Sequence, residues 1–335
     1  MRNDMGKSAP TCVFIKSMTA HRSARTTGRI SAIAGLLALC FLWSLDSLRS
    51  DLFPGPASNP LPPLAGEAVP FALLALASAL FAAFRNIEWP RPHQIRTSIL
   101  FALGLFVVPA ELVALSSHRI SDLTRVALFS LVPVFAVVFE PHLGRAHAAQ
   151  NRTTLLAALA AMAGTLCLYP VSVPSSIAAG LAFSALILAT ASIAAANCAA
   201  VAVACEFAGK SIAPLAAIAA LTAATGLLLL SALTEPATYH WSAFQPVLAW
   251  SAIVELPALL LLFWLLRRMS APRMTTRFLL APLLTSLIGL VALRPTVDLR
   301  AGLGLFLIPA AAAWLLFAPE EEPPSSALTL KLDRN

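Results

Sequence analysis

The sequence predicts an all-α membrane protein with ten transmembrane helices. Of its 335 residues, 59% are hydrophobic and 12% are charged, whereas a soluble domain carries about 25% charged residues. The apolar residues form continuous runs, which excludes a transmembrane β-barrel because barrel strands alternate polar with apolar side chains. The five cysteines are an odd number and do not predict a disulfide framework.

Ten apolar segments are long enough to serve as the membrane spans. A helix crosses about 30 Å of hydrocarbon with about 20 residues, and shorter segments in a bundle are accommodated by local thinning of the bilayer. The predicted spans cover residues 30–48, 69–84, 97–115, 123–139, 153–169, 177–204, 212–233, 244–266, 278–293 and 301–317.

The two ends of the chain are polar. Residues 1–29 contain six basic residues and one acid before the first apolar run begins at Ile30, which differs from a secretory signal. We expect residues 1–29 to form a flexible basic tail on the cytoplasmic side. Residues 318–335 are rich in charge and proline, and we expect a disordered cytoplasmic tail there.

The basic residues are distributed as the positive-inside rule requires. With residues 1–29 in the cytoplasm, 18 of the 23 Lys and Arg residues fall on the cytoplasmic side. The remaining five are Arg49, Arg119, Arg125, Arg294 and Arg300. Both termini are therefore predicted to be cytoplasmic. The net charge of +7 serves orientation against the lipid bilayer, and no nucleic-acid partner is expected.

An internal repeat is indicated by an alignment at an offset of 149 residues. It matches Ser121 with Ser270, Phe129 with Phe278 and Pro133 with Pro282. The alternative is a chance alignment of two helices rich in Leu, Val and Ala. A repeat of five helices must be inverted, because five is an odd number. We therefore predict two inverted five-helix repeats, residues 30–170 and 177–317, which is a recurrent plan of secondary transporters.

Three apolar stretches are distinctive: residues 250–293, the closing helix AGLGLFLIPAAAAWLLF and, in the first half, the aromatic-bearing LCFLWSLDSL. In these stretches the chain resembles the ten-helix, EamA-like transporters of the drug/metabolite transporter superfamily. The resemblance extends from Ile30 to Phe317 and is best in the second half, while LCFLWSLDSL is similar to the family's first helix. The chain departs from the family where Ser44 replaces a common glycine and where FEPHLGR and ALRPTVDL replace the usual Gly-Glu pairs.

This resemblance implies a carrier in the inner membrane with its site in a central cavity. We expect alternating-access transport of a small polar or zwitterionic, amino acid-like metabolite, by export and with proton coupling. The expected partners are the small-molecule substrate, the lipid bilayer and, as an open alternative, a second copy in a homodimer. The competing hypothesis is a non-transporting scaffold or accessory of a membrane-embedded enzyme, which the missing Gly-Glu pairs favour.

Glu255 is the first candidate for a functional residue. It is the twelfth residue of the predicted span 244–266, about 17 Å from the start of that helix, so its carboxyl group cannot reach an interface. An ionisable group at this depth is a site candidate. Glu255 is expected to bind a proton or substrate, the alternative being a neutral, hydrogen-bonded structural residue. Pro257 removes a backbone donor nearby.

A mixed-charge group is predicted at the outer ends of the first, third and fourth spans. Asp46, Glu111 and Arg125 lie a turn or more inside these ends, and Arg119 and Asp122 lie nearer the water. Opposite charges at one mouth suit an ion-pair gate or the two ends of a zwitterion. The alternative is a set of interfacial residues in contact with water.

Each of the remaining polar and aromatic candidates has a structural role as the alternative to a functional one. Asn197, deep in the sixth span, either contacts substrate or bonds a neighbouring helix, and Trp43 and Trp250 either line a cavity or anchor helix ends at the interface. Five charged residues toward the cytoplasmic ends are expected to set the topology: Glu140, Glu206, Arg267, Arg268 and Arg277.

An enzyme is not predicted. All six histidines fall outside the predicted spans, and the nearest grouping, Glu140 with His142 and His147, lacks a fourth ligand of metal type. No glycine-rich phosphate loop is present. The sequence thus predicts no catalytic residues, no metal site and no cofactor.

Overall fold

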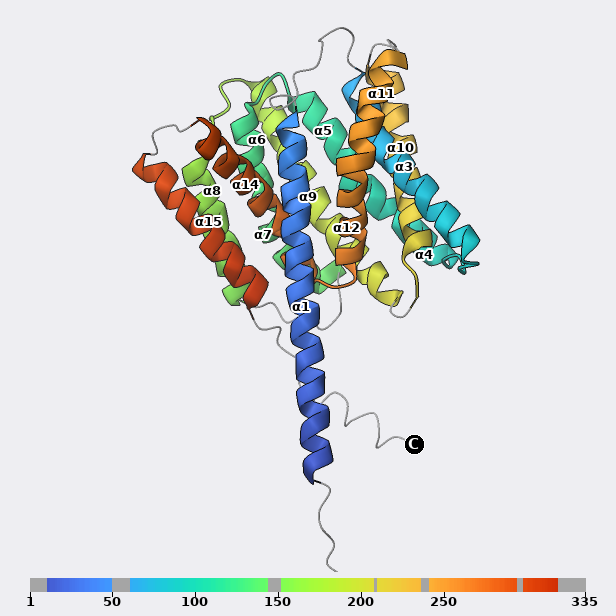
Figure 1. The fold of residues 1–335 in the computed structure, drawn as a ribbon. Coiled ribbons are helices and arrows are strands. Elements are labelled where there is room, and N and C mark those ends of the chain that lie inside the picture. The colour runs from blue at the N-terminus through green and yellow to red at the C-terminus, as the bar shows by residue number, and fades with distance from the viewer. Residues whose placement is uncertain are drawn as a thin grey trace, which may run out of the picture.

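The computed structural model describes residues 11–49, 61–143, 152–207, 210–235, 241–293 and 298–318. These residues form a bundle of helices (Figure 1). In the first half the helices are α1 (Thr11–Ser47), α3 (Pro63–Phe84), α4 (Pro92–Ala102), η1 (Leu103–Val107), α5 (Val108–Ser116), α6 (Asp122–Phe129), α7 (Val132–Leu143) and α8 (Arg152–Leu168). In the second half they are α9 (Ile177–Glu206), α10 (Ala213–Thr234), α11 (Trp241–Trp250), η2 (Ser251–Glu255), α12 (Leu256–Leu266), α13 (Ala271–Thr275), α14 (Arg277–Leu293) and α15 (Leu299–Phe317).

The prediction of ten apolar helices is confirmed for the described residues. Nine of their helices are long and apolar enough to cross a membrane, and a tenth, Arg152–Leu168, is shorter and apolar. Three spans begin five or more residues earlier than predicted: the second at Pro63, the third at Pro92 and the ninth at Ala271, where α13 precedes α14. In all three, proline occupies the first turn, where its missing N–H costs nothing.

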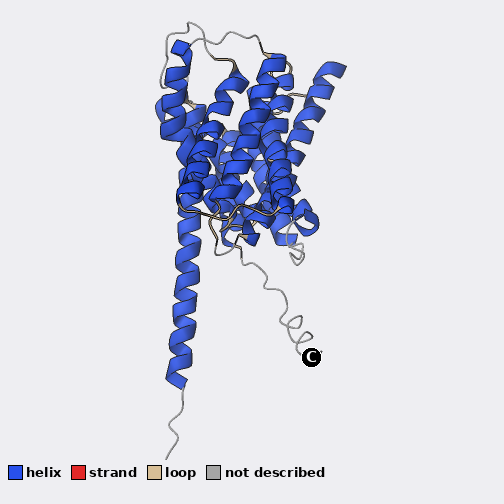
Figure 2. Cartoon of the chain, turned by 90° about the vertical axis from the view of Figure 1, so that its right-hand side faces the viewer, coloured by secondary structure: helices blue, strands red, loops and turns tan. Residues whose placement is uncertain are grey.

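The first helix is longer than the sequence predicted. Residues 11–29, expected within a flexible tail, are helical, and α1 extends well beyond the bundle (Figures 1 and 2). Between Thr11 and Thr27 the chain has neither glycine nor proline, so nothing interrupts the helix that continues from the apolar span. The expected tail 318–335 lies outside the described residues apart from Ala318.

Side-chain caps begin several of the helices. Ser121, Ser176 and Asp298 each accept a hydrogen bond from the backbone N–H three residues on, at the starts of α6, α9 and α15. Such caps satisfy backbone donors that have no partner within the helix. The three caps therefore mark the residues at which the fourth, sixth and tenth spans begin.

Four of the spans are irregular. The third and eighth contain the five-residue π-helices η1 and η2, and the fourth and ninth are broken between α6 and α7 and between α13 and α14. At η1 the Val108 N–H donates to Leu103, and at η2 the Leu256 N–H donates to Ser251. Each π-helix is followed at the second residue by proline, Pro109 or Pro257, which cannot donate to the preceding turn.

The helices pack in characteristic pairs. α3 lies along α10, and α8 lies along α15. α1 packs on α12 and α14, while α9 packs on α5 and α7. The α8–α15 pair is close because two glycines meet: a Cβ on Gly304 would lie 2.7 Å from the Gly164 carbonyl oxygen. The buried core is built largely from Ala and Leu on these contacting faces.

The start of the first span and the end of the last lie at the same end of the bundle. Arg29 donates from Nη2 to the Leu316 carbonyl at 2.8 Å, and Arg268 approaches Ser31 at 3.4 Å. We call this end of the bundle the Arg29 end and the opposite end the Asp46 end. An even number of crossings explains why α1 enters and α15 leaves at one end.

Candidate functional site

Arg277 is a charged residue buried in the middle of the bundle. It is the first residue of α14 and only 1% exposed. Its Nη1 donates to the Met274 carbonyl at 3.1 Å and its Nη2 to Asn197 Oδ1 at 2.9 Å, while Nε is buried without a hydrogen-bond partner. Arg277 was expected toward the cytoplasmic end of its span as a topology determinant; it lies six residues into the span Ala271–Val291 and is buried, because α13 precedes it.

Aromatic side chains enclose the Arg277 guanidinium. Its central carbon lies 4.7 Å from the ring centroid of Phe278 and 5.5 Å from that of Trp43. The Trp43 and Phe278 centroids are 6.4 Å apart, and Phe129 stacks on Phe278 with centroids 6.3 Å apart and planes at 21°. Cation–π contacts of this kind hold a guanidinium plane in one orientation.

Asn197 positions Arg277 from the facing helix. The Asn197 side chain is fully buried, and its Nδ2 donates to the Ile193 carbonyl at 2.7 Å. That bond directs Oδ1 towards Arg277. Asn197, predicted as a substrate contact or as a link between helices, thus bonds α9 to α14. We name Arg277, Asn197, Trp43, Phe129 and Phe278 the arginine box.

The arginine box contains no carboxylate partner for its cation. Within the described part of the chain, the ion pairs join His93 to Glu206, Arg125 to Asp122 and Lys210 to Glu88. Arg277 therefore lacks a counter-ion among the described side chains.

A second polar group lies towards the Asp46 end. Trp250 Nε1 donates to Asp46 Oδ1 at 2.7 Å, and the Ser251 hydroxyl donates to Glu255 Oε2 at 2.5 Å. The carboxyl groups of Asp46 and Glu255 are within hydrogen-bonding reach of each other. Three predicted candidates, Asp46, Trp250 and Glu255, thus meet at one place.

Two further carboxyl groups join this group. Glu235, the C-cap of α10, accepts from the Leu64 N–H at 3.0 Å and from the Ser231 hydroxyl at 2.6 Å. Glu67 on α3 lies close enough to both Asp46 and Glu235 for electrostatic interaction. We name Asp46, Glu67, Glu235 and Glu255 the acidic cluster. Arg49 stands beside it, 5.4 Å from the Trp250 ring.

One helix connects the arginine box with the acidic cluster. On α1, Trp43 contacts Arg277 and Asp46 contacts Trp250 and Glu255. Residues three apart on a helix share a face and differ by about 4.5 Å along its axis. One face of α1 therefore contacts the positively charged arginine box at Trp43 and contributes Asp46 to the acidic cluster.

Glu111 and Arg125 are not brought to either centre. Arg125 forms an ion pair with the exposed Asp122, one helical turn earlier. Glu111 Oε2 and Arg125 Nε are buried without a hydrogen-bond partner. Among the described residues, no hydrogen bond or ion pair connects Glu111 or Arg125 to the arginine box or the acidic cluster.

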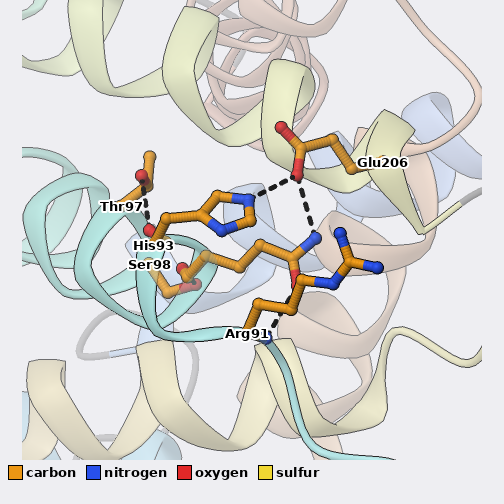
Figure 3. A network of polar contacts seen from close by, with 6 residues as sticks. Arg91, His93, Thr97, Ser98 and Glu206 are labelled. Atoms are coloured by element: carbon orange, nitrogen blue, oxygen red, sulfur yellow. Dashed lines mark hydrogen bonds and ion pairs between the residues drawn. The ribbon is translucent and has the colours of Figure 1, made fainter.

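Polar contacts at the Arg29 end link the region where α3 meets α4 to the region where α9 meets α10. Glu206 at the end of α9 accepts from Gln94 at 2.9 Å and lies 3.4 Å from His93, both on α4 (Figure 3). Lys210 Nζ donates to Glu88 at 3.4 Å. These contacts join the α3–α4 connection to the α9–α10 connection. A cavity of about 240 Å³ beside them is lined by Ile87, Glu88, Phe207, Lys210 and Ser211.

Solved structures share this fold. No protein-family model and no curated protein matches the chain. Among solved structures, 28 chains match. One of them, described only as "Crystal structure of protein", superposes with a TM-score of 0.67 over 86% of this chain and 99% of its own, at 18% identity. The likeness establishes the fold alone: a multi-pass, all-helical membrane protein.

Proposed function

We propose that the protein is a secondary active transporter of the EamA-like kind that moves a small polar or zwitterionic metabolite across the inner membrane. It works by alternating access, exports its substrate and is coupled to protons. The single observation that carries the proposal is that one face of α1 lies against a buried cation, Arg277, and, one turn further on, at a pair of half-buried carboxyl groups, Asp46 and Glu255. In a membrane interior, such groups mark substrate and ion pathways.

The packing of the helices supports two inverted repeats as the basis of alternating access. At an offset near 149 residues, α3 is the counterpart of α10 and α8 is the counterpart of α15, and each lies along its counterpart. The contacts of α1 with α12 and α14 are likewise the counterparts of those of α9 with α5 and α7. Phe129 and Phe278, matched in the sequence alignment, stack on each other, as expected of equivalent residues beside a pseudo-two-fold axis.

The two π-helices support the same relationship. η1 and η2 are both five residues long and lie 148 positions apart, each followed by an equivalent proline, Pro109 or Pro257. π-Helical turns are frequently found at functional sites and weaken the local hydrogen-bond ladder. We propose that these two places are the paired hinges on which the third and eighth spans bend.

The carboxyl pair supplies a site for proton coupling. Asp46 and Glu255 lie within hydrogen-bonding reach, and two carboxyl groups can share a hydrogen bond only when one of them holds a proton. Opening the Asp46 end to water would favour ionisation of both groups, and closing it would favour the shared proton. The protonation state is in this way tied to the conformation.

The proposed orientation has the Arg29 end in the cytoplasm. It follows from the distribution of Lys and Arg residues and places both termini inside. The contacts of Glu206 with Gln94 and of Lys210 with Glu88 are then a cytoplasmic gate, closed in this conformation.

The proposal is tested by transport in proteoliposomes. Purified protein is reconstituted, and uptake and efflux of a radiolabelled pool of amino acids and related metabolites are followed with and without a pH gradient. Movement that responds to the gradient supports a proton-coupled carrier. Folded protein that moves no member of the pool under either condition would favour the scaffold or accessory hypothesis instead.

A further inference from the structure

We infer that the arginine box is a binding site for the carboxylate group of a small monocarboxylic metabolite, with Arg277 as its anchor. The inference rests on the proposed function in one respect: the bound molecule is taken to be the transported one. It goes beyond that proposal by naming the residue that anchors the substrate and the group of the substrate that it binds.

The first argument is the unbalanced charge. Arg277 is 1% exposed, and its polar neighbours Asn197 and Met274 offer neutral oxygens. A buried cation without a counter-ion is costly in hydrocarbon, and proteins pair such charges or keep them for ligands. Since the described ion pairs do not include Arg277, an anion from outside the chain is the missing partner.

The second argument is the donors that remain. A guanidinium has five N–H donors, and hydrogen bonds to Met274 and Asn197 use two of them. Nε is buried with no acceptor. The N–H groups along the Nε edge form the fork that binds a carboxylate with two parallel hydrogen bonds. Nε–H on this edge is the donor of Arg277 that the described residues leave unused, and the Nη2 on the same edge donates one hydrogen bond to Asn197.

The third argument is that Arg277 is held ready for binding. Phe278 and Trp43 contact the guanidinium through their rings at 4.7 and 5.5 Å, and Asn197 is itself fixed by its bond to Ile193. The guanidinium therefore gives up little rotational freedom when it binds. Preorganisation of this kind strengthens binding without adding contacts.

The charges around the box favour a monocarboxylate over a dianion. Arg277 is the single cation of the arginine box, and the next charged position along α1 is acidic Asp46. A phosphate dianion would meet one positive charge and then a carboxyl group. A zwitterion would place its carboxylate on Arg277 and its amino group towards the acidic cluster, with both charges matched.

Binding is tested on the purified, detergent-solubilised protein by thermal unfolding and tryptophan fluorescence. The probes are acetate, glycine, ethylamine and chloride at matched ionic strength. We expect saturable stabilisation by acetate and glycine, stronger for glycine, and none by ethylamine or chloride. Equal responses to acetate and chloride would overturn the inference, because a general anion effect would then explain both.

Three variants assign the binding to Arg277. Arg277→Gln is expected to abolish the acetate response, and Arg277→Lys to weaken it at least about tenfold because the planar fork is lost. Arg125→Gln, which removes a cation outside the box, should respond like the wild type. An unchanged acetate response in Arg277→Gln would overturn the assignment.

Asn197→Asp provides an independent test if Arg277→Gln fails to fold. The substitution is nearly isosteric and places a carboxylate beside Arg277, so the protein supplies its own counter-ion. We expect a folded protein of equal or higher thermal stability that no longer binds acetate. Binding of acetate as in the wild type would overturn the inference.

The outcomes for binding and for transport can be told apart. Carboxylate binding through Arg277 without transport in proteoliposomes would support the site and contradict the proposed transporter. Transport that is unaffected by Arg277→Gln would support the transporter and overturn the role of Arg277.

Discussion

Phe129 and Phe278 stack on each other with ring centroids 6.3 Å apart and planes at 21°, although they come from different halves of the chain. They are the residues that the offset of 149 positions aligns. Their contact brings the break in the fourth span and the break in the ninth span together, beside Arg277. On the proposed inverted repeats, this stack would lie beside the axis between the two halves, where movement of one half relative to the other is smallest.

Replacing the carboxyl pair should remove proton coupling. Glu255→Gln and Asp46→Asn each leave one carboxyl group that cannot share a proton with a second. We expect each single variant to lose the stimulation of transport by a pH gradient while still inserting and folding. Asp298→Asn, which changes an exposed carboxyl group at the start of α15 and keeps its capping oxygen, is the control. A variant of the pair that keeps full stimulation would contradict the shared proton.

The two prolines after the π-helices should act alike. Pro109→Ala and Pro257→Ala restore a backbone donor and allow a regular α-helix to form through η1 and η2. We expect both variants to be more stable to heat and to transport more slowly, by a similar factor. Pro309→Ala, in the uninterrupted and lipid-exposed part of α15, should leave the transport rate unchanged. Opposite effects of the first two variants would argue against paired hinges.

The contact between α8 and α15 should tolerate no side chain at Gly304. A Cβ there would lie 2.7 Å from the Gly164 carbonyl oxygen and 2.9 Å from the Leu168 Cβ, so Gly304→Ala must push the helices apart. Overpacking of this kind costs about 1–3 kcal/mol. In Gly302→Ala, two residues earlier, the added Cβ meets nothing within 4 Å. Unfolding in detergent should show a loss of stability for the first variant and none for the second.

The hydrogen bond from Arg277 to Asn197 should contribute to stability. Asn197→Ala leaves Nη2 of a buried guanidinium without its acceptor, which costs about 1–3 kcal/mol. Ser184→Ala, which removes a hydrogen bond from the exposed Ser184 of the same helix, should cost less than about 0.5 kcal/mol. Thermal unfolding compares the two. Equal losses would mean that Asn197 does not support Arg277.

Hydropathy was sufficient to predict the ten helices, because a long run of apolar residues is rarely found outside a membrane span. It could not locate Arg277. A charge at the edge of an apolar run resembles an interfacial residue, and only the short helix α13 shows that Arg277 lies inside. A signal was present: Ser121 caps α6, and its aligned counterpart Ser270 is the N-cap of α13.

The acidic cluster was predicted in part for a similar reason. Asp46 and Glu255 lie within apolar runs and could be recognised as ionisable groups inside predicted spans; in the structure both are half-buried. Glu67 and Glu235 lie just outside the predicted second and seventh spans, and the structure adds them because α3 begins at Pro63 and Glu235 caps α10. The π-helices leave no trace in hydropathy, and Pro109 and Pro257 were their only sign.

Alternating access is tested most directly by fixing the Arg29 end closed. Glu88→Cys and Lys210→Cys, introduced together into a variant without native cysteines, replace the two residues whose side chains are 3.4 Å apart. A short reducible thiol crosslinker should stop transport in proteoliposomes, and reduction should restore it, while Glu88→Cys alone should be unaffected. Undiminished transport by fully crosslinked protein would contradict the account.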